Sequence, residues 1–137
     1  MSENAANKLA KRAVAQVGML SAQFLLGMAV NLIGLPKETS GLSKGATTVF
    51  LSIHGIVGLA LLVGSLLAVR RARPVSPHFV RDAWIGVGLV VFTLVAGLLT
   101  LFQDNNWWSY LMAVGFLAAL LLYGAMFVYA SRQAKTQ

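Results

Sequence analysis

Four apolar stretches dominate the chain, separated by short segments rich in polar and charged residues. Read approximately, they run over residues 13–35, 47–69, 83–102 and 107–130. A helix that rises about 1.5 Å per residue needs roughly 20 residues to cross about 30 Å of hydrocarbon, so each stretch can span a bilayer. The stretches are too long for barrel strands, and backbone groups in lipid must bond internally. The pattern therefore predicts four transmembrane helices.

The connections predict how these helices are arranged. Residues 103–106 barely separate the third and fourth helices, and the other two connections are polar and contain Gly or Pro. Because short connections make neighbouring helices antiparallel, we expect an all-α four-helix bundle over residues 13–130, with tails over 1–12 and 131–137. Ser76 before Pro77 is typical of an N-cap followed by proline in the first turn, and Asp104 to Asn106 can cap the fourth helix.

An internal repeat points to a duplicated two-helix hairpin. A shift of 60 residues aligns the fourth helix on the second, and a shift of 70 aligns the third on the first. The matched glycines are Gly55 and Gly115, Gly64 and Gly124, Gly18 and Gly88, and Gly27 and Gly97. The two glycines of each helix are nine residues apart and face opposite sides, so we expect each helix to pack closely on two neighbours. Chance similarity between Leu- and Gly-rich segments is the alternative explanation.

Charge sets the expected orientation. Nine Lys and Arg residues belong to the two tails and the second connection, against two on the other side, so both termini are expected in the cytoplasm of a cell-membrane protein. Trp107, Trp108 and Tyr110 are then expected at the outer membrane interface, and Trp84 and Tyr129 at the inner one. The arginines that could contact anionic lipid headgroups are Arg70, Arg71, Arg73 and Arg81.

Composition narrows the function. The chain is 58% hydrophobic and only 11% charged, against roughly 25% charged residues in soluble domains. Its net charge of +7 is split among short segments between apolar runs, which does not favour a nucleic-acid surface. The chain has no cysteine, P-loop, GxSxG, zinc-ligand spacing or paired carboxylates, so neither an enzyme nor a metal site is expected.

Polar residues inside the predicted spans form stripes on three helices. At about 100° per residue, polar and small side chains share one face of each helix. These residues are Gln16, Gln23, Gly27, Asn31 and Gly34 on the first, Thr47, His54, Gly58 and Ser65 on the second, and Asp82, Gly86, Thr93, Gly97, Thr100 and Asp104 on the third. Polar groups in membrane spans usually face the bundle interior. Their depths predict an outer-half cluster of Gln23, Asn31, His54, Thr93 and Thr100.

Several interpretations of this cluster are open. An interhelical hydrogen-bond set would contribute about 0.6 kcal/mol per bond. A haem b site could use His54, but His78 belongs to the inner connection and the repeat places Val114 opposite His54, so pairing in a homodimer or with Met28 or Met112 would be needed. Transport of protons or a small solute along neutral polar side chains is another possibility. A lipid- or quinone-contacting subunit, using Trp107 and Trp108, is the last.

The stretches FLLGMAVNLIGLP (residues 24–36) and HGIVGL (residues 54–59) resemble a group of small four-helix bacterial membrane proteins. The resemblance implies a cell-membrane protein in which Asn31 and His54 belong to one site, and it implies no particular activity. Our leading hypothesis is a non-catalytic multi-pass protein without a cofactor that self-associates in the bilayer or joins a membrane partner. A haem b electron-transfer protein and a transporter are the alternatives.

Overall fold

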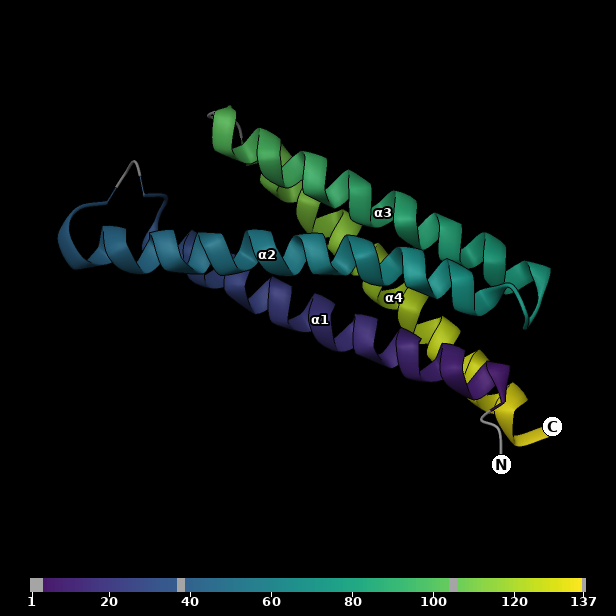
Figure 1. Ribbon diagram of the computed structural model, residues 1–137. Coiled ribbons are helices and arrows are strands. Elements are labelled where there is room, and N and C mark those ends of the chain that lie inside the picture. The colour runs from purple at the N-terminus through teal and green to yellow at the C-terminus, as the bar shows by residue number, and fades with distance from the viewer. Residues whose placement is uncertain (1–3, 37–38, 104–105, 137) are drawn as a thin grey trace.

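The computed structural model describes residues 4–36, 39–103 and 106–136, and these residues form four long helices. The helices are α1 (Ala5–Ile33), α2 (Gly41–Ala72), α3 (Pro77–Phe102) and α4 (Asn106–Thr136). Each is long and apolar enough to cross a membrane. Helices α1 and α3 each pack against both α2 and α4 (Figure 1). The predicted all-α antiparallel bundle is confirmed, and the chain is a multi-pass membrane protein.

The two ends of the bundle differ in charge. The described parts of both termini lie at the same end as the α2–α3 connection (Figure 1). We call this the basic end, because nine Lys and Arg residues occupy the tails and that connection. We call the opposite end, where α1 joins α2 and α3 joins α4, the far end.

All four helices continue beyond the apolar stretches, and α1 and α4 do so into the two tails. Helix α1 begins at Ala5, where the side chain of Asn4 accepts a hydrogen bond from the backbone N–H of Asn7 at 3.0 Å. Leu9 is fully buried, so this first segment packs as part of the bundle. Helix α4 continues to Thr136. The reason is that basic residues such as Lys and Arg are good helix formers, so a helix need not end where hydrophobicity ends.

Capping residues fix where α1 ends and α3 begins. The Ser76 side chain accepts a hydrogen bond from the backbone N–H of Phe79 at 3.4 Å, and Pro77 occupies the first turn, as predicted. Gly34 ends α1 with a φ of 95°, a conformation that favours glycine, and its N–H bonds the Val30 carbonyl at 2.9 Å. The predicted cap on α4 falls outside the described residues, since these omit Asp104, Asn105 and the side chain of Asn106.

Exposed aromatic side chains mark both membrane interfaces. Trp84 and Tyr129 project outward toward the basic end, where they are 52% and 60% exposed. At the far end, Trp107 and Tyr110 make an edge-to-face ring contact with centroids 5.5 Å apart. The Trp108 indole N–H donates to the Gln103 side-chain oxygen at 2.6 Å. Amphipathic rings favour the headgroup region, so these positions agree with the predicted belts.

The core follows a seven-residue spacing and fills the half of the bundle nearest the basic end. On α4 the buried residues recur at alternating steps of three and four: Phe116, Ala119, Tyr123, Met126 and Ala130. This spacing is typical of helices that pack side chains into the gaps of their neighbours. Many of the buried positions are alanine or glycine, which let membrane helices approach closely.

Each helix packs on two neighbours, as predicted, but only one glycine of each spaced pair contacts a neighbouring helix. The members that meet a neighbouring helix are Gly27, Gly64, Gly97 and Gly115, and the members where an added Cβ would meet open space are Gly18, Gly55, Gly88 and Gly124. The reason is geometric. The two glycines face opposite sides, whereas the two neighbours of a helix in a four-membered ring lie on adjacent sides.

Gly86 provides a test of the packing between α3 and α4. A Cβ atom added there would lie 2.5 Å from the Tyr123 hydroxyl oxygen and 2.7 Å from the ring carbon that bears it. Tyr123 is fully buried and cannot move aside. We predict that Gly86→Ala lowers the free energy of unfolding by about 1–3 kcal/mol, measured by denaturant titration in mixed micelles.

Gly88→Ala is the matched control, because Gly88 lies on the same helix and an added Cβ would meet nothing within 4 Å. Its free energy of unfolding should stay within about 0.5 kcal/mol of the parent value. Equal losses in both variants would contradict this account of the α3–α4 contact.

Candidate functional site

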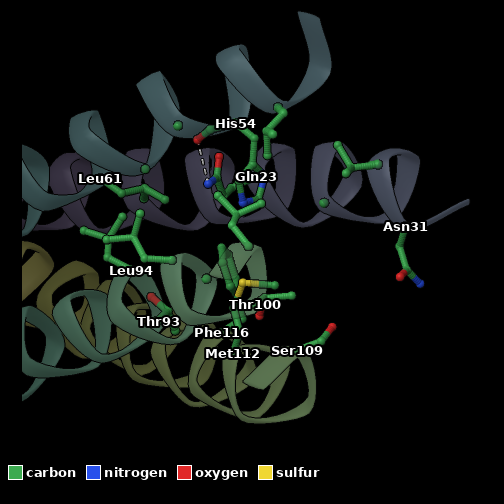
Figure 2. Close-up of a pocket in the computed structure, with 18 of the residues that line it drawn as sticks. Gln23, Asn31, His54, Leu61, Thr93, Leu94, Thr100, Ser109, Met112 and Phe116 are labelled. Carbon is green, nitrogen blue, oxygen red and sulfur yellow. Dashed lines mark hydrogen bonds between the residues drawn. The ribbon is translucent and has the colours of Figure 1, made fainter. Parts of the chain in front are cut away.

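A cavity of about 830 Å³ occupies the far-end half of the bundle. Residues from all four helices line it, and Figure 2 shows it with its main side chains. Its volume falls within the range of roughly 300–1,000 Å³ that is usual for small-molecule sites. We call it the far-end cavity.

Four apolar side chains, one from each helix, separate the cavity from the packed core. These residues are Leu20, Leu61, Val90 and Phe116. They belong to the core and also line the cavity, so we call them the floor layer. The core continues from the floor layer to the basic end. The far-end cavity is therefore closed toward the basic end.

The cavity exists because α2 and α3 diverge toward the far end (Figure 1). Just beyond the floor layer they still touch at Gly58, where an added Cβ would lie 3.1 Å from Leu94 Cδ2. Further out, glycines line the opening where larger side chains could have filled it: Gly27, Gly34, Gly55 and Gly97. The cavity therefore results from the divergence of α2 and α3 and from the small size of the residues that line it.

His54 lies in the cavity wall where α1 and α2 meet. Its ring packs over Gly27, so that an added Cβ would lie 3.2 Å from His54 Cε1. The Gln23 side-chain N–H donates to the backbone carbonyl of His54 at 2.8 Å, which joins the two helices at this depth (Figure 2). His54 Nδ1 is buried and has no hydrogen-bond partner among the described residues.

All five residues of the predicted polar cluster line the cavity, but they do not form one hydrogen-bonded set. The hydroxyl of Thr93 donates to the Val90 carbonyl at 2.8 Å, and that of Thr100 donates to the Ala96 carbonyl at 2.9 Å, both within α3. Asn31 is exposed near the end of α1, apart from His54 (Figure 2). The structure brings together Gln23 and His54.

The methionines that could accompany His54 as haem ligands have different surroundings. Met112 lines the far-end cavity, and its sulfur lies 3.2 Å from a Cβ added at Gly97. Met28 is 44% exposed on the outer surface and does not line the cavity. His78 is exposed in the first turns of α3, at the basic end.

A second cluster of polar side chains is buried in the core, and the sequence did not predict that its members lie together. The Gln16 side-chain N–H donates to the Leu61 carbonyl at 3.1 Å, and Ser65 donates to the Leu62 carbonyl at 2.7 Å. The Tyr123 side chain faces both Gln16 and Ser65. Tyr123 could have been found from the steps of three and four along α4, which place it between buried Ala119 and Met126.

The four arginines proposed for lipid headgroups are all exposed at the basic end, and two of them have specific surroundings. Arg81 forms an ion pair with the adjacent Asp82, with Nη2 and Oδ1 3.1 Å apart. Arg71 lines a small pocket together with residues of α1. Arg70 and Arg73 lie outside that pocket.

Comparisons with protein-family models, with curated proteins and with solved structures give no match to this chain. The function is therefore argued from the geometry alone.

Thiol labelling can test whether the cavity is open, because the native chain has no cysteine. We predict that a Thr93→Cys variant reacts with a small water-soluble methanethiosulfonate, since Thr93 lines the cavity although it is only 8% exposed. Ser65→Cys is the matched control, because Ser65 is a small polar residue that is fully buried beyond the floor layer. It should react only after unfolding.

Equal labelling of the two variants in the folded state would show that the floor layer does not close the cavity. A lack of reaction at both positions would show that the cavity is sealed at the far end.

Proposed function

We propose that this chain is a non-catalytic multi-pass protein of the cell membrane that holds a small amphipathic molecule in its far-end cavity. The observation that carries the proposal is the position of His54 in the wall of a large, mainly apolar space. Ligand sites of this kind combine an apolar lining with a few polar groups that fix orientation. The proposal keeps the basic end on the cytoplasmic side, as the charge distribution favours.

The surroundings of His54 indicate which chemistry it offers to a ligand. Because Nδ1 is buried, Nε2 is the ring nitrogen that a ligand in the cavity can reach, and we assign the proton of the neutral ring to Nδ1. Nε2 then presents a lone pair and accepts a hydrogen bond. The matching ligand has a hydroxyl group at one end and an apolar body that fills the space toward Leu94, Met112 and Phe116.

The transport alternative and one part of the leading hypothesis gain less support. The floor layer closes the cavity toward the basic end, so no observation favours a transport path across the bundle. Self-association or a membrane partner rests on the sequence hypothesis, since the outward apolar faces suit lipid and a second subunit equally well.

A pair of probes that differ by one hydroxyl tests the proposed ligand class. We predict that octylphenol raises the unfolding temperature of the protein in detergent more than octylbenzene does, because only the phenol can donate to His54 Nε2. One neutral hydrogen bond contributes about 1 kcal/mol, which corresponds to roughly fivefold tighter binding. The measurement is a thermal unfolding curve at increasing probe concentration.

His54→Leu should abolish the preference for the phenol while leaving binding of octylbenzene nearly unchanged. Ser52→Leu is the matched control, because Ser52 is exposed two residues earlier on α2 and its hydroxyl bonds its own helix at 2.8 Å. No preference in the parent protein, or a preference that survives in His54→Leu, would contradict the proposal.

A haem b protein is the second candidate, favoured by one observation: His54 and Met112 line the same cavity from different helices. The exposed Met28 does not fit this arrangement. Histidine and methionine together are an established pair of axial haem ligands. The position of the His54 ring over Gly27, inside the bundle, favours this pair over two copies of His54 in a dimer.

Absorbance decides between these two candidates. If the protein binds haem b through His54 and Met112, haem added to the purified protein should give a Soret band that His54→Ala abolishes and Met112→Leu shifts. Met28→Leu is the matched control and should leave the spectrum unchanged. A folded protein that takes up no haem would remove this candidate and leave the hydroxyl-ligand proposal standing.

A further inference from the structure

A second, strongly cationic pocket lies at the basic end, far from the cavity. It has a volume of about 370 Å³ and lies where α1 meets the last turn of α2. Its lining consists of four basic residues and one alanine: Lys8, Lys11, Arg12, Ala15 and Arg71. We call it the basic pocket.

The spacing along α1 explains why these side chains converge. Lys8, Lys11, Arg12 and Ala15 are separated by steps of three, one and three residues, so they share one face of the helix. Arg71 reaches the same space from α2. Like charges at such spacing destabilise a bare helix surface, and an anion bound among them would remove that repulsion.

Arg12 is held in place by the fold. Its Nε donates to the Gly64 carbonyl at 3.2 Å, and its Nη2 lies 2.6 Å from the position of a Cβ on Gly64. A larger residue at position 64 would push this guanidinium away from α2. The arginine is therefore positioned between the helices, with its charge at the inner wall of the basic pocket.

Exposed apolar side chains lie close in sequence to the residues of the basic pocket on both helices. Val14, which precedes Ala15, is 46% exposed, and Leu67, one turn before Arg71, is 38% exposed. An amphiphile could therefore place a charged head among the basic residues and an acyl chain along these apolar side chains. A soluble anion would contact only the basic residues.

We propose that the basic pocket binds the phosphate group of an anionic phospholipid, with an acyl chain lying along Val14 and Leu67. Arginine offers several N–H donors in a fixed plane that suits phosphate oxygens, and the lysines add mobile charge. Basic pockets between transmembrane helices are known to take such headgroups. The site is independent of the far-end cavity and does not rest on the function proposed for it.

The test compares three additives by thermal unfolding of the full-length protein in a neutral detergent. They are dioctanoyl phosphatidylglycerol, dioctanoyl phosphatidylcholine and inorganic pyrophosphate. We expect the anionic lipid to raise the unfolding temperature at the lowest concentration. The double variant Lys8→Gln/Arg71→Gln should require roughly 25-fold more of that lipid, at about fivefold for each charge removed.

Arg70→Gln/Arg73→Gln is the matched control, because it removes the same charge from the same end of α2 but from outside the pocket. Its response to the lipid should change much less. If Lys8→Gln/Arg71→Gln does not fold, Lys11→Gln, at an exposed position of the same pocket, should weaken the response about fivefold.

Three results would overturn the proposal. Equal weakening in the two double variants would show that the lipid responds to overall charge. Equal stabilisation by phosphatidylcholine would show that the pocket does not select an anionic headgroup. Pyrophosphate acting as strongly as the lipid would show that the source of phosphate is a soluble anion.

Discussion

Close contact between helices in the half nearest the basic end is the constraint on which the rest of the molecule depends. Lipid tails are as apolar as leucine, so helices in a bilayer associate through tight packing and hydrogen bonds. Tyr123 meets this need by lying directly against Gly86, beside Gln16 and Ser65. Because the helices are locked together there, α2 and α3 can diverge toward the far end without the bundle coming apart.

The α1–α2 hairpin and the α3–α4 hairpin place different side chains against the glycines that the predicted repeat aligns. Gly27 on α1 receives the ring of His54 from α2, and Gly97 on α3, its counterpart in the predicted repeat, receives the sulfur of Met112 from α4. Equivalent glycines thus accept different side chains, which places two chemically distinct groups on the cavity wall. Gly64 accommodates Gln16 and Arg12, whereas its counterpart Gly124 faces open space. The basic pocket therefore belongs to the α1–α2 hairpin, whereas the far-end cavity lies between the two hairpins.

The sequence predicted the elements well and their spatial relations only in part. The number and order of the helices and the Ser76–Pro77 cap depend on local chemistry, and the structure agrees with them, although every helix runs beyond its apolar stretch. The inward faces of α1 to α3 also follow from helical periodicity, which places Gln23, His54 and Thr93 on the cavity wall. Periodicity gives direction but not the distance between helices. It therefore could not show that the Thr93 and Thr100 hydroxyls bond their own helix, or that α2 and α3 leave a space between them.

The floor layer has a consequence for how such a protein can change over generations. Leu20, Leu61, Val90 and Phe116 divide the bundle into a part that holds the fold and a part that surrounds the cavity. Substitutions beyond the floor, on the cavity side, alter shape and polarity where the helices are already apart. Selection can therefore adjust what the cavity accepts at little cost to folding, while the residues near Tyr123 remain under strict packing constraints.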